Sequence, residues 1–174
     1  MKICFYFLIV ISLVMMVPRG AQGDPPKKET PGKAMHASPV ERGRYLTTIS
    51  GCNDCHSPKK MTPQGPVPDE ALLLSGHPAA EKIPEIPKDV LGMPPEHWAA
   101  LGNAHFTAWV GFWGVSYAAN LTPDTETGLG SWTPEMFIKA MRTGKHMGEG
   151  RPILPPMPWP NFAQMTDEDL QAIF

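Results

Sequence analysis

The chain has 174 residues, of which 42% are hydrophobic and 18% charged, a composition typical of one globular domain and not of a disordered chain. Lys and Arg number 15 against 17 Asp and Glu, so no basic excess exists to neutralise a phosphate backbone, and a nucleic-acid partner is not expected. With 21 prolines and 16 glycines, much of the fold must be loop, which argues against a long coiled coil or a large parallel sheet.

The first 23 residues have the pattern of a secretory signal. Lys2 precedes an uncharged run at residues 3–17, Pro18 interrupts this run, and small residues precede a cleavage site after Gly23. The run is shorter than the roughly 20 residues of a membrane span, although an uncleaved anchor is the alternative. We expect a signal peptide at residues 1–23, a flexible polar linker at 24–37, and a periplasmic or otherwise exported mature chain without a membrane span.

A helix is predicted to begin at residue 38. Ser38 and Glu41 form a capping box, and Pro39 occupies the first helical position, where its missing N–H costs nothing. The helix should end near Gly51. It therefore delivers residues 52–56, which read Cys-Asn-Asp-Cys-His, at its C-terminal end.

Residues 52–56 match the attachment signature of c-type haem. Cys52 and Cys55 are spaced to form thioether bonds with the two vinyl groups of one porphyrin, and His56 then reaches the iron. A thioredoxin-like dithiol would need a preceding strand, and a zinc site would need two further ligands at paired spacing; neither is found. The chain has one such motif, which predicts one covalently attached haem c.

The stretch from residue 57 to residue 119 is predicted to be irregular. Nine prolines lie between residues 58 and 95, and only residues 70–75 and 95–101 are short helical candidates. Residues 106–117 then hold five aromatic side chains, which pack a core, wall off one edge of the haem, or do both.

Two more helices are predicted, over residues 133–143 and from residue 166 onward. Each starts with a threonine cap and acidic residues in its first turn, and the second stops after two turns, so the final helix appears truncated. Between them, residues 151–162 contain five prolines. They predict a stiff, extended loop suited to hold the side chain of Met157 in one place.

In this order the elements resemble the class I cytochrome c family, and in particular exported bacterial monohaem cytochromes. The resemblance covers about residues 38–174 and rests on the haem motif and on residues 120–124, 127–132, 142–144, 157–159 and 167–170. It implies an all-α haem fold whose first and last helices cross, with Gly43 against Leu170 and Phe174. The long separation between His56 and Met157 then marks residues 68–119 as an insertion.

The sixth iron ligand implied by the resemblance is Met157. The prolines around it favour it over Met147 and His146, because a weak thioether bond benefits from a rigid backbone. A histidine ligand and an open iron position are the alternatives. The choice decides between functions, since Met/His ligation closes the iron to substrates.

Three more residues are candidates for the haem site. The Gly65-Pro66 turn resembles the turn whose backbone accepts the N–H of the proximal imidazole in this family, here His56. Asn120 and Trp132 are candidates for hydrogen bonds to the haem propionates. The alternative is that residues 120–124 only form a turn.

These residues predict an electron-transfer protein and not an enzyme. It would take single electrons from a periplasmic dehydrogenase or a quinol-oxidising complex and pass them to a terminal acceptor such as an oxidase. Two alternatives stay open. One is a cytochrome subunit permanently docked to a dehydrogenase through residues 68–119, and the other is a five-coordinate haem peroxidase or gas-binding protein.

Overall fold

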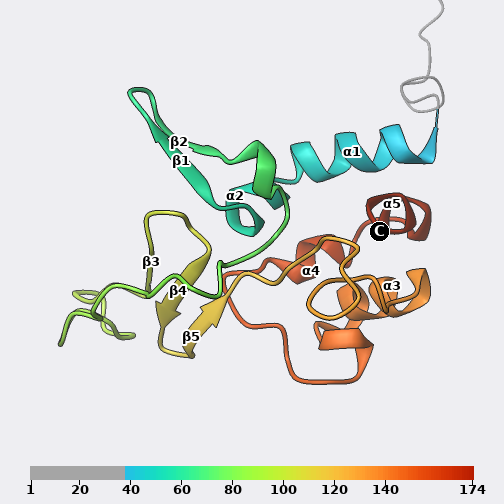
Figure 1. Ribbon diagram of the computed structural model, residues 1–174. Coiled ribbons are helices and arrows are strands. Elements are labelled where there is room, and N and C mark those ends of the chain that lie inside the picture. Colours follow the sequence, from blue (N-terminus) through green and yellow to red (C-terminus); the bar gives the residue numbers. More distant parts are fainter. Residues whose placement is uncertain (1–37) are drawn as a thin grey trace, which may run out of the picture. The chain divides into compact units, whose positions relative to one another are not determined.

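The computed structural model describes residues 38–174, which form five α-helices, two 3-10 helices and five strands (Figure 1). The predicted signal peptide at residues 1–23 and linker at 24–37 lie outside the described residues. No helix between residues 38 and 174 is long and apolar enough to cross a membrane.

The haem motif follows the first helix as predicted. Helix α1 (Pro39–Ile49) is capped by Ser38, whose hydroxyl accepts a hydrogen bond from the Glu41 N–H at 3.2 Å. Gly51 then has a φ of 68°, a left-handed conformation that costs little without a Cβ. The chain changes direction at this glycine, and the short helix α2 (Cys52–His56) begins directly after it.

The expected all-α fold is wrong, because the described residues also form two antiparallel sheets. Every strand lies within residues 57–119, which were expected to be irregular. A two-stranded sheet pairs β1 (Lys59–Thr62) with β2 (Gly65–Pro68), and a three-stranded sheet has the order β3 (Ala100–Gly102), β4 (Ala108–Gly111), β5 (Gly114–Tyr117). The fold is therefore mixed α/β.

The position of the prolines and glycines explains this difference. Pro66 and Pro68 lie in β2, which has one neighbouring strand, so a proline can occupy it without disrupting a second ladder. Gly111 pairs with Gly114 across a two-residue turn that joins β4 to β5. Of the two short helical candidates, the first contains a 3-10 helix, η1 (Glu70–Leu72), and the second contains no helix.

The two C-terminal helices begin at their predicted caps. The Thr133 hydroxyl accepts from the Met136 N–H at 3.3 Å, and the Thr166 hydroxyl accepts from the Asp169 N–H at 3.1 Å. The expected loop at residues 151–162 contains no helix or named strand up to residue 158, turns at residues 155–156 and ends in a short helix. The elements of this region are α3 (Pro134–Thr143), η2 (His146–Gly148), α4 (Trp159–Phe162) and α5 (Asp167–Ile173).

Helices α3 and α5 hold the main hydrophobic core. Phe137, Ala140 and Met141 of α3 pack with Leu170 of α5, whose side chain is fully buried. Partly buried apolar side chains surround this cluster, among them Trp132 and Met157. Burial of such side chains is the main favourable contribution to folding, about 1.5–3 kcal/mol for each large one.

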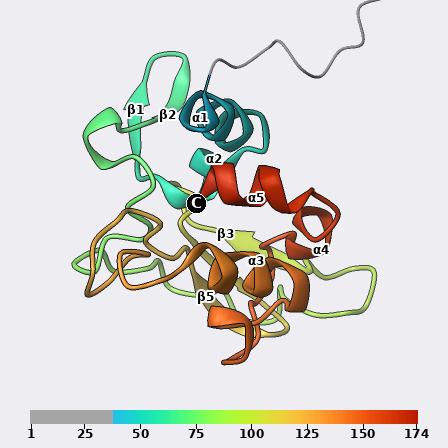
Figure 2. The ribbon, with the colours of Figure 1, turned by 90° about the vertical axis from the view of Figure 1, so that its right-hand side faces the viewer.

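Helices α1 and α5 cross, as the resemblance implies (Figure 2). Their backbones approach so closely at Gly43 that a Cβ there would lie 1.8 Å from the Ala172 carbonyl oxygen. Beside this crossing, the Arg42 guanidinium donates two hydrogen bonds to the Asp169 carboxylate, at 2.9 and 3.1 Å. The Phe174 ring lies 5.6 Å from the Phe137 ring, so it also packs on α3.

Candidate haem-binding site

Helix α2 presents the two cysteines on one face. Cys52 and Cys55 are three residues apart, close to one helical turn, and both thiols are free and half-buried. A thioether forms when a thiol S–H adds across a vinyl double bond. One helix face with two thiols therefore fits two neighbouring vinyl groups on the edge of a single porphyrin.

The electrostatics of the thiols do not favour a redox-active dithiol. Burial raises the pKa of the Cys52 and Cys55 thiols, and the Asp54 carboxylate raises both further. Burial therefore favours the protonated thiols, whereas dithiol exchange uses the thiolate. Within residues 38–174, no group of three or more His, Cys, Asp or Glu side chains is placed to hold a metal ion.

The His56 imidazole is held by a backbone carbonyl. Its Nδ1 lies 2.7 Å from the carbonyl oxygen of Ala119, 63 residues further along the chain. A carbonyl can only accept, so Nδ1 carries the proton and Nε2 keeps its lone pair. Burial lowers the pKa of His56, which favours the neutral ring at pH 7. A neutral imidazole of fixed tautomer is the form that ligates iron.

The expected carbonyl partner of His56 was the Pro66 turn, and the structure places Pro66 elsewhere. Pro66 lies in β2 opposite Met61. It lines a cavity of about 390 Å³ beside Cys55, whose wall also includes Pro68, Phe106 and Trp109. The charged Asp54 and Lys59 also line this cavity, so an apolar wall that fits a porphyrin edge lies beside two charged side chains.

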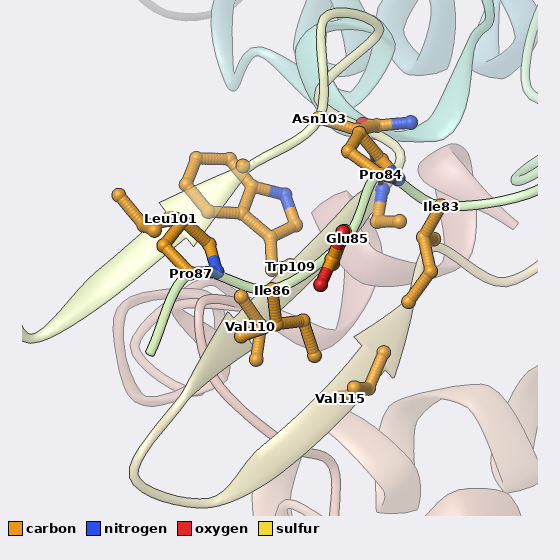
Figure 3. A pocket seen from close by; sticks show the side chains of 12 residues that line it. Ile83, Pro84, Glu85, Ile86, Pro87, Leu101, Asn103, Trp109, Val110 and Val115 are labelled. Carbon is orange, nitrogen blue, oxygen red and sulfur yellow. Dashed lines mark hydrogen bonds between the residues drawn. The ribbon is translucent and has the colours of Figure 1, made fainter. Parts of the chain in front are cut away.

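A second cavity, of about 250 Å³, lies between residues 83–87 and the three-stranded sheet (Figure 3). Trp109, Val110 and Val115 line it from the sheet side. No cysteine, histidine or methionine is among its lining residues, so it offers the iron no ligand.

Met157 lies on the proline-rich loop and is half-buried against the α3–α5 core. The Ser116 hydroxyl of β5 donates to the Pro155 carbonyl at 2.6 Å, and the Met157 N–H donates to the Leu154 carbonyl at 3.3 Å. Its competitor Met147 is 38% exposed. The loop thus holds Met157 against other parts of the chain, whereas Met147 faces solvent.

The side chain of Asn120 is engaged in a turn. Its carbonyl oxygen accepts from the Thr122 N–H at 2.9 Å and from the Thr122 hydroxyl at 2.7 Å, and its amide donates to the Thr127 hydroxyl at 2.9 Å. These bonds form a turn at residues 120–124, which was the alternative to a hydrogen bond between Asn120 and a haem propionate. Trp132 packs on the core and makes an edge contact with the exposed ring of His146, their centroids 5.0 Å apart.

Three polar residues that fix α2 were missed in the sequence. The fully buried Ser57 donates to the Asn53 side chain at 2.7 Å and accepts from the Leu74 N–H at 2.8 Å. The Lys59 ammonium donates to the Asn53 carbonyl at 2.8 Å, and the His105 Nδ1 accepts from the Lys59 N–H at 2.8 Å. Burial lowers the pKa of Lys59. None of these residues belongs to a motif, so only their contacts in the structure reveal the role.

Comparisons with known proteins find cytochrome c subunits among the proteins similar to this chain. The chain is 29% identical over 135 residues to the cytochrome c subunit of an alcohol dehydrogenase (quinone) from Gluconobacter oxydans, which is 78% of this chain and 20% of that protein. It is also 29% identical over 135 residues to the gluconate 2-dehydrogenase cytochrome c subunit of Pantoea cypripedii, 78% of this chain and 22% of that protein. No protein-family model matches the chain.

A shorter similarity has higher identity. Over 61 residues the chain is 41% identical to the cytochrome c subunit of an alcohol dehydrogenase (quinone) from Komagataeibacter europaeus, which is 35% of this chain and 13% of that protein. The chain spans about a fifth of the length of the first two relatives. Cytochrome c subunits of dehydrogenases are thus among its relatives, which supports a cytochrome c family.

Proposed function

We propose that this chain is a monohaem c-type cytochrome that transfers single electrons in the periplasm, with His56 and Met157 as the iron ligands. The observation that carries the proposal is the α2 motif, in which two thiols share a face and the His56 imidazole is held with its Nε2 unprotonated. When bound, haem c supplies a one-electron Fe(III)/Fe(II) couple.

Each protein group has a separate task in this function. Cys52 and Cys55 attach the haem covalently, so that an exported protein does not lose it. The Ala119 carbonyl fixes the ring plane and tautomer of His56. Met157 would be the second protein ligand of the iron, which would raise the reduction potential and exclude substrates.

The electron donor we propose is a periplasmic dehydrogenase, and the acceptor a terminal oxidase. The names of the relatives support the donor, because each is a subunit of a dehydrogenase. The same names favour a second candidate function, that of a cytochrome subunit permanently docked to its dehydrogenase. A quinol-oxidising complex as donor rests on the sequence alone.

Carbon monoxide distinguishes an electron carrier from a haem enzyme or gas-binding protein. The ferrous holoprotein, mixed with carbon monoxide in a stopped-flow instrument, is expected to show no rapid spectral change, because Met157 occupies the position that the gas requires. A potentiometric titration should be reversible with a one-electron slope of about 59 mV per decade. Rapid carbon monoxide binding would contradict the proposal and favour an open iron site.

A further inference from the structure

One short segment of the chain contacts both His56, at the end of α2, and the loop of Met157, the two residues that would ligate the iron. Ser116, in β5, donates its hydroxyl to the Pro155 carbonyl at 2.6 Å, two residues before Met157. Three residues later, the Ala119 carbonyl accepts from the His56 ring at 2.7 Å. Residues 116–119 therefore connect the His56 side and the Met157 side of the site.

We propose that Ser116 is a positioning residue that keeps Met157 on the haem iron by holding the Pro155 carbonyl. The inference rests on the proposed His56 and Met157 ligation and adds to it a residue that touches neither ligand directly. It also adds a contact with the Met157 loop to the contacts with the His56 side that residues 68–119 already make.

The Ser116 hydroxyl is itself fixed in direction. The Trp113 indole N–H donates to the Ser116 oxygen at 3.2 Å, which leaves the hydroxyl hydrogen for the Pro155 carbonyl. The backbone of Ser116 is paired with Trp109 of β4. The β4–β5 pairing and the Trp113 indole thus fix the position of the Ser116 hydroxyl independently of the Met157 loop.

The loop depends on this donor because it has few hydrogen bonds of its own. Pro155 and Pro156 have no N–H to donate. The backbone hydrogen bonds of residues 152–158 are those of the Ile153 N–H to the Gly144 carbonyl at 2.8 Å, of the Met157 N–H to the Leu154 carbonyl at 3.3 Å and of the Asn161 N–H to the Pro158 carbonyl at 2.9 Å. Among the side-chain hydrogen bonds within residues 38–174, the bond from Ser116 is the one that reaches residues 152–158.

A weak iron–thioether bond makes such a contact measurable. Every excursion of the loop that lifts Met157 from the iron exposes the sixth position to a competing ligand. Losing one hydrogen bond of ordinary strength is expected to raise the population of the open form about five-fold. The affinity of the ferric protein for a competing ligand then rises by the same factor.

Imidazole binding to the ferric holoprotein tests the inference, with the far-red absorbance band of the Met–Fe(III) bond as the readout. Ser116→Ala should bind imidazole about five-fold more tightly than the wild type. Ser116→Thr, which restores the hydroxyl and suits a strand, should return to the wild-type affinity. The matched control is Ser75→Ala, which also removes a serine hydroxyl that donates to a carbonyl, that of Leu72 at 2.9 Å.

The outcomes separate this inference from the proposed function. If the wild type has the far-red band and Ser116→Ala binds imidazole no more tightly than wild type and Ser75→Ala, Ser116 does not position Met157. An equal gain in Ser116→Thr also overturns the inference, because the hydroxyl is then irrelevant. A wild type without the band refutes the Met157 ligation instead.

Discussion

Replacing Met157 with alanine is expected to abolish the far-red band of the ferric haem and to let the ferrous iron bind carbon monoxide rapidly. The alanine methyl group cannot reach the iron, so the sixth position opens. Because a thioether ligand favours the ferrous state, the reduction potential should fall by on the order of 100 mV. Optical spectra, stopped-flow binding of carbon monoxide and a redox titration of the same sample measure the three effects.

The matched control is Met147→Ala, since Met147 was the other methionine considered as a ligand. Its side chain is 38% exposed, and we expect its loss to leave the band, the potential and the carbon monoxide reaction unchanged. Retention of the band in Met157→Ala, or its loss in Met147→Ala, would show that another group ligates the iron.

The largest expected effect on stability comes from Gly43→Ala in α1. In an open helix this change stabilises by about 1 kcal/mol, because glycine is a poor helix former. At Gly43, however, the new Cβ would lie 1.8 Å from the Ala172 carbonyl oxygen, so α1 and α5 must separate. Overpacking outweighs propensity, and the expected loss in unfolding free energy is about 3 kcal/mol.

Urea unfolding of the holoprotein measures this loss, and the melting temperature should fall by about 6–12 °C. Arg44→Ala is the control, because Arg44 is the next residue of the same helix and is exposed. If Gly43→Ala proves as stable as Arg44→Ala, the distance between the α1 and α5 backbones at Gly43 is larger than in the structure.

The parts of the fold that could be predicted are those that a short stretch of sequence encodes. The caps at Ser38, Thr133 and Thr166 depend on a side chain and an N–H three residues away, and each is formed as expected. The crossing at Gly43 followed from the resemblance. The haem motif is local as well, and the similarity to cytochrome c subunits agrees with the family that it indicates.

The strands could not be predicted in the same way. Nine prolines between residues 58 and 95 made the region look irregular, although Pro66 and Pro68 are compatible with a strand that has one neighbour. The aromatic residues of β4 and β5 were interpreted by their size, as core or haem-wall side chains, and not as parts of strands. The pairing of Gly111 with Gly114 across a two-residue turn was the overlooked signal for a hairpin.

The candidate site shows the same limit. Cys52, Cys55 and His56 are adjacent in the sequence, whereas the group that holds the His56 ring is the backbone carbonyl of Ala119, which no side-chain pattern reveals. The role of Ser116 depends likewise on a contact 39 residues along the chain. The assignments of Met157, Asn120 and Trp132 stay predictions.

The optical spectrum of the purified holoprotein in both oxidation states, with the haem content per chain, tests the central claim most directly. The account predicts a c-type spectrum, one haem per chain that acidified solvent does not extract, and a weak far-red band in the ferric form. A high-spin ferric spectrum without that band would contradict Met/His ligation. An enzyme or gas-binding protein would then replace the electron carrier as the best account of this chain.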